Sequence, residues 1–396
     1  MMEAQHDILA TSFKPWKIWV AVGLGLLIAI VILFSGVRQV QFVKVTNGKG
    51  DYAWKDANQN GKIDIHNSHE FIAVTKGDYI KQRASDALKQ LEWSSSSILW
   101  IFIAILFMVG RDLFYMIRIR VLTHKKLGWK SSFHVIMLWE FASALSPGVV
   151  GGAAVAMFIL NREKIPLGRS TAIVFITTMM DNLFYVLMIP LVFLFIDSAT
   201  LFPENTSYSL GVQWVFWIGF SIILIACLFL FFAVFILPSW SGWMLNTLFK
   251  LPFLSRWKEG ASRTADDLLV SSKELRKEPL SFWAGAFIST CGSWICRYLV
   301  INALLQAFIQ FGIMDHILIL GKQLVLWIFM LISPTPGGSG VAEYAFGELL
   351  MPFGMSAAML AGIAVLWRLI SYFPYLFIGA ILLPRWVKQT GQSGLK

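Results

Sequence analysis

Eight long apolar runs constrain the fold of this chain more than any other feature. A helix needs about 20 mostly apolar residues to span a hydrocarbon core of roughly 30 Å, and most of the runs reach that length. They lie at about 16–36, 95–117, 132–160, 171–196, 211–237, 281–309, 317–350 and 356–383. The alternating pattern of a membrane barrel is not visible, so spanning segments must be helices. With 57% apolar and 14% charged residues, the chain is predicted to be an all-α polytopic membrane protein.

An internal repeat relates the two halves of the chain at an offset of 186 residues. Between 151–172 and 337–358, eight of 22 positions are identical, whereas composition alone gives roughly two. The identical pairs are Gly151 and Gly337, Gly152 and Gly338, Val155 and Val341, Ala156 and Ala342, Pro166 and Pro352, Gly168 and Gly354, Ser170 and Ser356, and Ala172 and Ala358. The chain is therefore predicted to contain two copies of one membrane unit.

Basic residues collect in the connections that are predicted to face the cytoplasm. They precede the run at 16–36, flank the run at 132–160 on both sides, and recur in 238–280 and in the tail. The connections at 197–210 and 310–316 carry no Lys or Arg and are predicted to face outward. Both termini would then be cytoplasmic, with the chain in a bacterial cytoplasmic (inner) membrane.

The runs at 132–160 and 317–350 fit this orientation only if neither crosses the membrane. Gly and Pro break each run near its centre, where a continuous helix is disfavoured. Both are therefore predicted to be re-entrant helical hairpins, the first on the cytoplasmic side and the second on the outer side. The repeats would be inverted, with about six transmembrane helices besides the hairpins. Kinked spanning helices are the alternative, because neighbouring helices can satisfy the freed backbone groups.

This topology divides the chain into six segments. They are a cytoplasmic N-terminus with the first helix (1–37), an extracytoplasmic loop (38–93), repeat 1 (94–196), a linking helix with a basic amphipathic cytoplasmic stretch (197–280), repeat 2 (281–383) and a cytoplasmic tail (384–396). Within the loop, 56–64 resembles the start of an EF-hand calcium loop, but Asn67 stands where a bidentate Glu is needed. A turn built on Asx and Gly chemistry is the alternative. The stretch at 258–278 is predicted to lie on the membrane surface.

Charged side chains inside apolar runs are functional candidates, since each costs about 2.5–3.5 kcal/mol on insertion scales. Asp181 and Asn182 lie about ten residues into the run at 171–196. Arg368 occupies the equivalent depth of the second copy, where it corresponds to Asn182. We predict an ion pair between Asp181 and Arg368, either as a bridge between the repeats or as a gate for a substrate.

Two further arginines are predicted to bind an anionic phosphate. Arg111, with Asp112 beside it, and Arg297 lie deeper in the membrane than a side chain reaching for the interface allows. Arg118 and Arg120 are predicted to be interfacial anchors instead.

The hairpins supply the remaining candidates, because broken helices offer free backbone amides and positive helix ends to a substrate. The candidates are Glu140, Ser146, Pro147, Gly151, Gly152, Ser333, Pro334, Pro336, Gly337, Gly338, Gly340 and Glu343. His134 and Glu140 are six residues apart and do not share a helical face, so no zinc site is expected. Neither a metal site nor catalytic residues are predicted.

The second hairpin break also carries a resemblance. The segment 333–340 (SPTPGGSG), followed by Glu343 and preceded by the PGxxG segment 147–151, resembles motifs of the flippase-like family of the lysylphosphatidylglycerol synthase transmembrane region. The resemblance covers about 94–383. Members include the membrane part of bacterial synthases, which moves aminoacylated phosphatidylglycerol between leaflets, and stand-alone proteins. The chain is similar to the stand-alone kind, since about a dozen residues follow its last predicted helix.

Taken with the buried arginines, the resemblance implies an integral membrane lipid translocase rather than an enzyme. Its partners would be anionic or zwitterionic membrane lipids, and possible further partners are a second copy or an envelope-biosynthesis enzyme. No nucleotide-binding loop or metal-ligand cluster is visible, so no cofactor is expected, and the net charge of +10 needs no nucleic acid to explain it. The alternatives are an enzyme or accessory acting on polyprenyl-linked sugars or envelope lipids, and a small-solute transporter.

Overall fold

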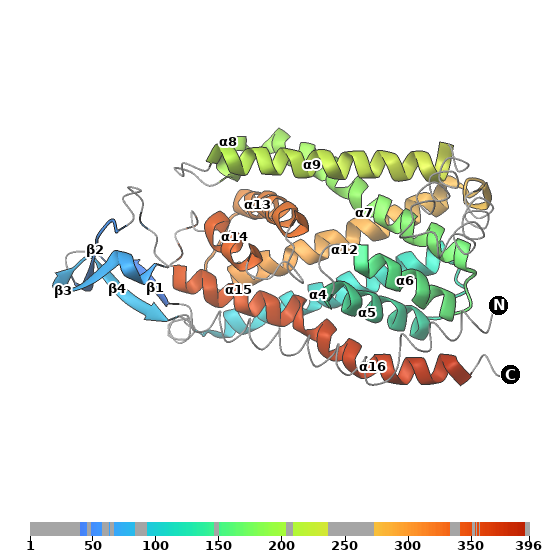
Figure 1. Cartoon of the computed structure of the whole chain (residues 1–396), viewed down its shortest axis with the longest axis horizontal. Helices are drawn as coiled ribbons and strands as arrows, with labels where there is room; N and C mark the ends of the chain where they lie inside the picture. The colour runs from blue at the N-terminus through green and yellow to red at the C-terminus, as the bar shows by residue number, and fades with distance from the viewer. Residues whose placement is uncertain are drawn as a thin grey trace, which may run out of the picture.

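The computed structural model of the chain shows an elongated bundle of helices with a small sheet at one end (Figure 1). It describes residues 40–45, 49–57, 63, 67–83, 93–145, 150–202, 209–236, 273–332, 341–350, 353, 355 and 357–392. The run at 16–36, the stretch at 258–272 and the hairpin breaks at 146–149 and 333–340 fall outside these residues. The prediction of an all-α polytopic membrane protein is confirmed for the bundle.

The helices of the bundle follow the apolar runs closely. They are α4 (Ser95–Leu122), α5 (Trp129–Leu145), α6 (Val150–Arg162), α7 (Leu167–Phe195), α8 (Ser198–Leu201), α9 (Ser209–Phe231), α12 (Leu280–Gln306), α13 (Ile313–Ile332), α14 (Val341–Leu350), α15 (Ala357–Ser371) and α16 (Phe373–Gln392). A π-helical turn, η2 (Phe232–Ile236), continues α9. Within the described residues, six helical stretches are long and apolar enough to cross a membrane: α4, α7, α9, α12, α13 and the α15–α16 stretch.

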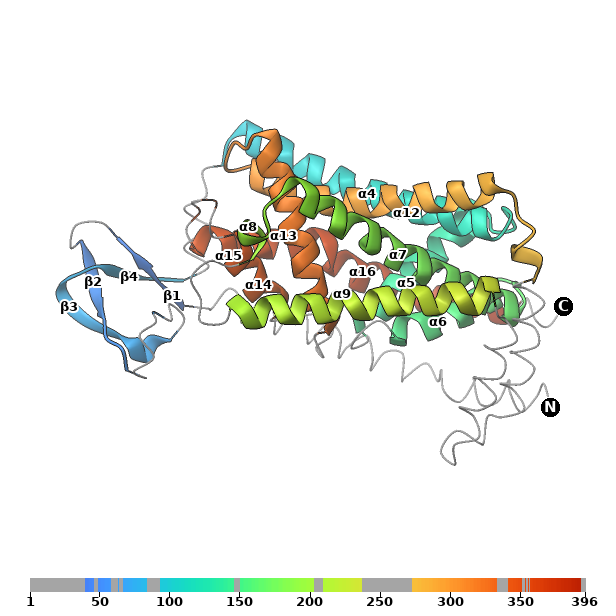
Figure 2. The same ribbon diagram turned by 90° about the horizontal axis from the view of Figure 1, so that it is seen from above.

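The two halves of the chain present the same order of elements. In each, a long helix (α4 or α12) is followed by two shorter ones that pack on each other (α5 with α6, α13 with α14) and then by a second long element (α7 or α15 with α16). The α13–α14 pair lies toward the sheet and the α5–α6 pair toward the opposite end of the bundle (Figure 1). Although α13 is long enough to span, it runs across the long helices rather than along them (Figure 2).

The re-entrant arrangement stays a prediction, and labelling can test it. In a variant whose three native cysteines are replaced, single cysteines at Gly128 and Lys164 should react with an impermeant thiol reagent from the cytoplasmic side. Cysteines at Asp315 and Phe353 should react from the outer side. If the two members of either pair label from opposite sides, that hairpin crosses the membrane and the repeats are not inverted as proposed.

The first helices of the two halves, α4 and α12, pack against each other over much of their length, along one side of the bundle (Figure 2). Small residues allow the close approach: a Cβ added to Gly292 would lie 2.7 Å from the ring of Phe114, and one added to Gly110 would lie 3.3 Å from Cys296 Sγ. Small residues at such contacts are typical of helix packing in membranes, where no hydrophobic force drives helices together.

The last predicted helix differs from the expectation of one helix over 356–383. A turn at Tyr372 separates α15 from α16, and α16 continues to Gln392. Pro374 explains the interruption, because it has no backbone N–H to donate to the preceding helical turn and is tolerated best in the first turn of a new helix. The segment that was predicted to be a tail is therefore largely helical.

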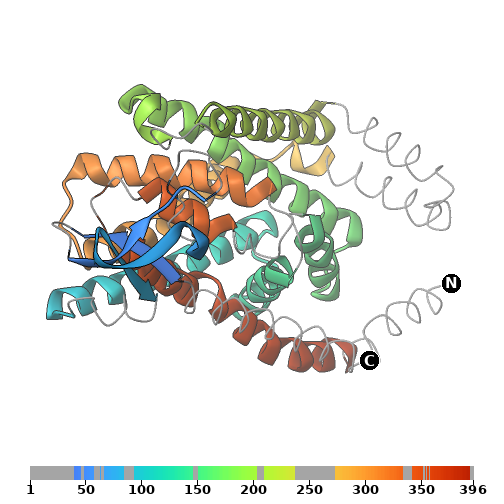
Figure 3. The same ribbon diagram turned by 60° about the vertical axis from the view of Figure 1, so that its left-hand side comes forward.

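The loop at 38–93, which was predicted to be extracytoplasmic, contains a four-stranded antiparallel sheet that the sequence did not predict (Figure 3). Its strands are β1 (Val40–Lys44), β2 (Gly50–Trp54), β3 (Phe71–Gly77) and β4 (Tyr79–Arg83), in the order β1-β4-β2-β3, with a short 3-10 helix, η1 (Ser68–Glu70), before β3. The core of the sheet is the aromatic group Phe42, Phe71 and Tyr79. Much of the calcium-like segment lies outside the described residues, and Asn67 instead caps η1 by accepting a hydrogen bond from the His69 amide.

The outer surface of the bundle is apolar over several helices. Large exposed hydrophobic side chains line α4, as at Phe102 and Leu106, and α9, as at Trp214 and Ile218. Soluble monomers rarely expose so much apolar surface, and these faces suit contact with lipid. Several charged side chains of the membrane helices turn inward instead, toward the cavity described next.

Candidate functional site

A cavity of about 250 Å³ lies inside the bundle, where α4, α5 and α7 of the first half face α12, α13, α15 and α16 of the second. Its volume is just below the roughly 300–1,000 Å³ of typical small-molecule sites, so it suits a small polar group rather than a long chain. The charged residues of its wall are Arg111, Arg118, Glu140, Asp181, Arg297 and Arg368. All of them lie on helices that carry candidate membrane spans or pack against them, where charges are costly and usually functional.

Arg111 on α4 is 1% exposed and holds two carboxylates. Its Nη1 donates to Asp112 Oδ1 and to the Tyr375 hydroxyl, both at 2.8 Å, and its Nη2 pairs with Glu140 Oε1 at 2.7 Å. The Tyr375 hydroxyl donates to Asp112 Oδ1 at 2.7 Å. This network ties α4 to α5 and α16. The protein itself thus compensates the charge of Arg111, which was predicted to contact phosphate directly.

Asp181 on α7 pairs with Arg118 and not with Arg368 as predicted. Arg118 Nη1 lies 2.6 Å from Asp181 Oδ1 and 3.1 Å from Thr290 Oγ1, and Trp294 Nε1 donates to the same carboxylate oxygen at 2.9 Å. Arg118 is 5% exposed, so the prediction that it is an interfacial anchor is also wrong. The physical reason is that Arg118 lies one turn beyond Tyr115 on the inward face of α4, within reach of α7.

Arg297 on α12 differs from these two arginines because it has no carboxylate partner within the described part of the chain. Its guanidinium lies over the rings of Trp327, 4.8 Å from the centroid, and Trp294, at 5.4 Å. Cation–π contacts of this kind hold the group in place without neutralising its charge. Arg297 is thus a lining cation that is open to an anion in the cavity.

The equivalent positions of the two repeats, Asn182 and Arg368, meet at the same cavity. Arg368 is 5% exposed, and its guanidinium lies over the rings of Trp367 and Tyr372, 5.0 and 5.2 Å from their centroids. Asn182 is half-buried beside Asp181. Asp181 pairs with Arg118 and not with Arg368, but the cavity brings the two equivalent positions together.

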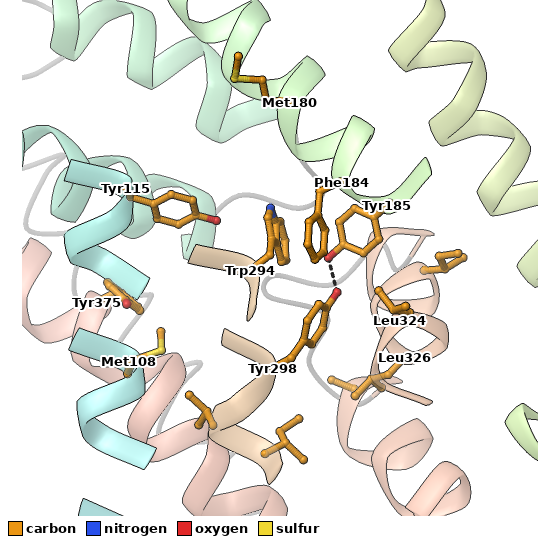
Figure 4. Close-up of a cluster of buried hydrophobic side chains, with 14 of the residues drawn as sticks. Met108, Tyr115, Met180, Phe184, Tyr185, Trp294, Tyr298, Leu324, Leu326 and Tyr375 are labelled. Carbon is orange, nitrogen blue, oxygen red and sulfur yellow. Dashed lines mark hydrogen bonds between the residues drawn. The ribbon is translucent and has the colours of Figure 1, made fainter. Parts of the chain in front are cut away.

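Aromatic side chains build much of the rest of the wall. Trp294 stands between Tyr115 on α4 and Tyr185 on α7 (Figure 4), and its ring centroid is 4.9 Å from those of both Tyr185 and Trp327. The buried hydroxyls of Tyr185 and Tyr298 share a hydrogen bond of 2.6 Å. These contacts join α7, α12 and α13 into one rigid side of the cavity.

The hairpin residues predicted to touch substrate are only partly described. Gly151 and Gly152 lie in α6, and a Cβ added to Gly152 would overlap the side chain of Ser143, a lining residue on α5. Glu343 lies in α14, but its side chain is outside the described residues. So are the other candidates, Ser146, Pro147, Ser333, Pro334, Pro336, Gly337, Gly338 and Gly340. Their roles stay predictions.

Helical spacing could have revealed the lining residues that the sequence prediction missed. Arg111, Tyr115 and Arg118 are spaced i, i+4 and i+7, which places them on one face of α4. On α12, Trp294 and Arg297 are three apart and share a face in the same way. Tyr115 and Trp294 were counted only as part of the apolar runs. Their helical spacing from the arginines nevertheless places them on the faces of α4 and α12 that line the cavity.

A second group of buried polar side chains, which lies on α12 and α13, was likewise not predicted from the sequence. Lys322 is 2% exposed within an apolar run. Beside it, Gln323 Nε2 donates to Asn302 Oδ1 at 2.8 Å, and the Asn302 amide donates to the His316 carbonyl at 3.0 Å. This group lies between α12 and α13 and is not among the lining residues of the cavity, so it serves the packing of these two helices.

Ion pairs between arginines and carboxylates determine what the cavity can do chemically. Glu140 and Asp181 each sit in an ion pair with an arginine at less than 3 Å, so neither is set up as a free acid or base. No group of three His, Cys, Asp or Glu residues that could hold a metal ion occurs in the described ranges. A site with several arginines and one lacking a carboxylate partner is suited to holding an anion.

Comparisons with known proteins agree with the motif resemblance. The chain is 26% identical over 306 residues to a UPF0104 membrane protein of Archaeoglobus fulgidus, an alignment that covers 74% of this chain and 89% of that protein. No solved structure matches the chain. The family model described as the lysylphosphatidylglycerol synthase TM region matches residues 84–379, which include all residues of the cavity wall. The chain is therefore a multi-pass membrane protein that belongs to the lysylphosphatidylglycerol synthase transmembrane-region family.

Proposed function

We propose that the protein is a lipid translocase, in which the cavity binds the phosphate-bearing headgroup of a membrane lipid on its way between leaflets. The observation that carries this proposal is Arg297, a lining cation with no carboxylate partner among the described residues. The cavity lies at the meeting of the two halves of the bundle, as the substrate site does in transporters built from repeats. Acyl chains would stay outside, against the apolar outer faces of the helices.

The other charges of the cavity have a supporting role in this proposal. The ion pairs of Arg111 with Glu140 and of Arg118 with Asp181 link α4 to α5 and to α7. Because breaking such a pair leaves a buried charge without compensation, the pairs would keep the wall in place while a headgroup passes. Asp181 would act with Arg118, and Arg368 would add positive potential from the opposite side.

The experiment is lipid exchange by purified full-length protein in liposomes, without nucleotide. We expect the protein to move an acyl-labelled phosphatidylglycerol between leaflets, because an anion gains most from the open arginine. Replacing Arg297 by Gln should reduce the exchange rate about tenfold, which corresponds to roughly the 1.4 kcal/mol of one charge-assisted hydrogen bond.

Arg120→Gln is the matched control. Arg120 also lies over a tryptophan ring, that of Trp129 at 4.3 Å, but it does not line the cavity, so its exchange rate should match that of the wild type. Exchange at the rate of protein-free vesicles for a panel of anionic, zwitterionic and polyprenyl lipids would reject the translocase. A response of the protein in a sugar-transfer assay would then support an accessory of polyprenyl-linked sugar metabolism.

A further inference from the structure

Several hydrogen-bonding groups of the cavity wall have no hydrogen-bond partner among the described residues. They are the Arg297 guanidinium, the Asn182 amide, the Tyr115 hydroxyl and the Trp139 indole N–H. The guanidinium and the indole can only donate, whereas the amide and the phenol can donate and accept. The open groups therefore favour a ligand rich in acceptors, such as phosphate oxygens and hydroxyls.

Among the described residues of the wall, in contrast, the two carboxylates are already engaged in ion pairs. Glu140 Oε1 lies 2.7 Å from Arg111 Nη2. Asp181 Oδ1 accepts hydrogen bonds from both Arg118 Nη1 and Trp294 Nε1. A primary ammonium group needs acceptors and is stabilised best by an unpaired carboxylate. To bind one here, the protein would have to share a carboxylate whose charge an arginine already compensates.

The aromatic rings of the wall are also occupied, by the protein's own arginines. The Tyr115 ring has the guanidinium carbons of Arg111 at 4.4 Å and of Arg118 at 4.6 Å from its centroid. The Tyr375 ring has Arg111 at 5.1 Å. A quaternary ammonium is recognised by several aromatic faces that surround it, and these two rings already hold cations.

Two tryptophans of the wall, Trp327 and Trp367, each have both a guanidinium and a second aromatic ring close to them. Trp327 has Arg297 over its ring at 4.8 Å and lies parallel to Tyr185, with centroids 6.0 Å apart. Trp367 has Arg368 at 5.0 Å and stacks on Phe346 at 5.5 Å. The aromatic residues therefore position arginines and do not form an open cage for a methylated ammonium.

From these contacts we infer that the cavity selects lipids whose headgroup is an anionic phosphate ester bearing hydroxyl groups, and discriminates against choline and ethanolamine headgroups. The phosphate would pair with Arg297, and the hydroxyls would bond to Asn182, Tyr115 and Trp139. This inference rests on the proposed translocase function and gives its substrate class. Phosphatidylglycerol and phosphatidylinositol are the test probes with this chemistry.

The test compares four acyl-labelled probes in the same liposomes with the full-length protein. Phosphatidylglycerol and phosphatidylinositol should exchange at least tenfold faster than phosphatidylcholine and phosphatidylethanolamine. Equal or faster exchange of the choline or ethanolamine probe would overturn the selectivity but leave the translocase in place. Exchange of no probe above protein-free vesicles would overturn both.

A pair of variants tests whether the covered rings are the cause. Arg297→Gln removes the cation and uncovers one face of Trp327, so the ratio of choline to glycerol exchange should rise about tenfold. Arg120→Gln uncovers Trp129, which is not in the cavity wall, and should leave the ratio unchanged. Both are compared per amount of folded protein, measured by size-exclusion chromatography. An unchanged ratio in Arg297→Gln would contradict the inference even if the overall rate falls.

Discussion

Replacing Arg111 by Met is expected to destabilise the protein by at least about 3–5 kcal/mol, the cost of leaving buried charge without its partner. Arg111 is 1% exposed and compensates both Asp112 and Glu140, so its loss strands two carboxylates. Thermal unfolding in detergent should show a large drop in Tm, together with poor recovery of folded protein.

The network offers its own controls. Glu140→Gln should cost less than Arg111→Met, because the arginine keeps Asp112 and the Tyr375 hydroxyl. Combined with Arg111→Met, Glu140→Gln should restore part of the lost stability, since one of the two stranded charges is removed. Arg120→Met on the same helix should stay within about 1 kcal/mol of the wild type, as expected at a helix end away from the core. An Arg111→Met variant as stable as Arg120→Met would mean that the network is not structural.

The second large effect is expected at Asp181. Asp181→Asn removes the charge that compensates Arg118, which is 5% exposed, and should cost about 3–5 kcal/mol. A double-mutant cycle with Arg118→Gln should give a coupling energy of about 0.5–3 kcal/mol, the range for residues in contact.

The same cycle with Arg368→Gln separates the two possible pairings. Because Asp181 contacts Arg118 and not Arg368, the losses of Asp181→Asn and Arg368→Gln should add to within about 0.5 kcal/mol. Thermal unfolding in one detergent, with all variants at the same protein concentration, gives the four values of each cycle. A strong coupling to Arg368 and none to Arg118 would contradict the geometry described for the cavity.

The fold was predictable wherever hydrophobic length set it. The apolar runs gave the long helices, and Gly and Pro placed the boundaries of α5 and α13, because the bilayer allows few alternatives to a helix. The sheet at 40–83 was missed, since its strands are only five to seven residues long and show little alternation. Its core depends on Phe42, Phe71 and Tyr79, which are brought together by pairing between distant segments.

The sequence predicted which charged residues lie deep in the membrane, but it did not predict which of them form ion pairs with each other. Hydropathy indicated that Arg111, Asp181, Arg297 and Arg368 lie inside the membrane, and all four line one cavity. Which carboxylate meets which arginine depends on the rotation of each helix about its axis, and packing sets that rotation. Arg118 is an example. Its position near the end of its helix suggested an interfacial anchor, but it lies on the inward face of that helix and pairs with Asp181.

Photocrosslinking tests the central claim, that the cavity holds a lipid headgroup, most directly. A phosphatidylglycerol analogue with a photoreactive group on the glycerol headgroup is irradiated with the full-length protein in liposomes, and the adducts are mapped by peptide mass spectrometry. We predict adducts on the α7 and α12 segments that carry Asn182 and Trp294, and their loss in Arg297→Gln but not in Arg120→Gln. Adducts confined to lipid-facing residues such as Trp214 on α9, with an unchanged pattern in Arg297→Gln, would contradict the account.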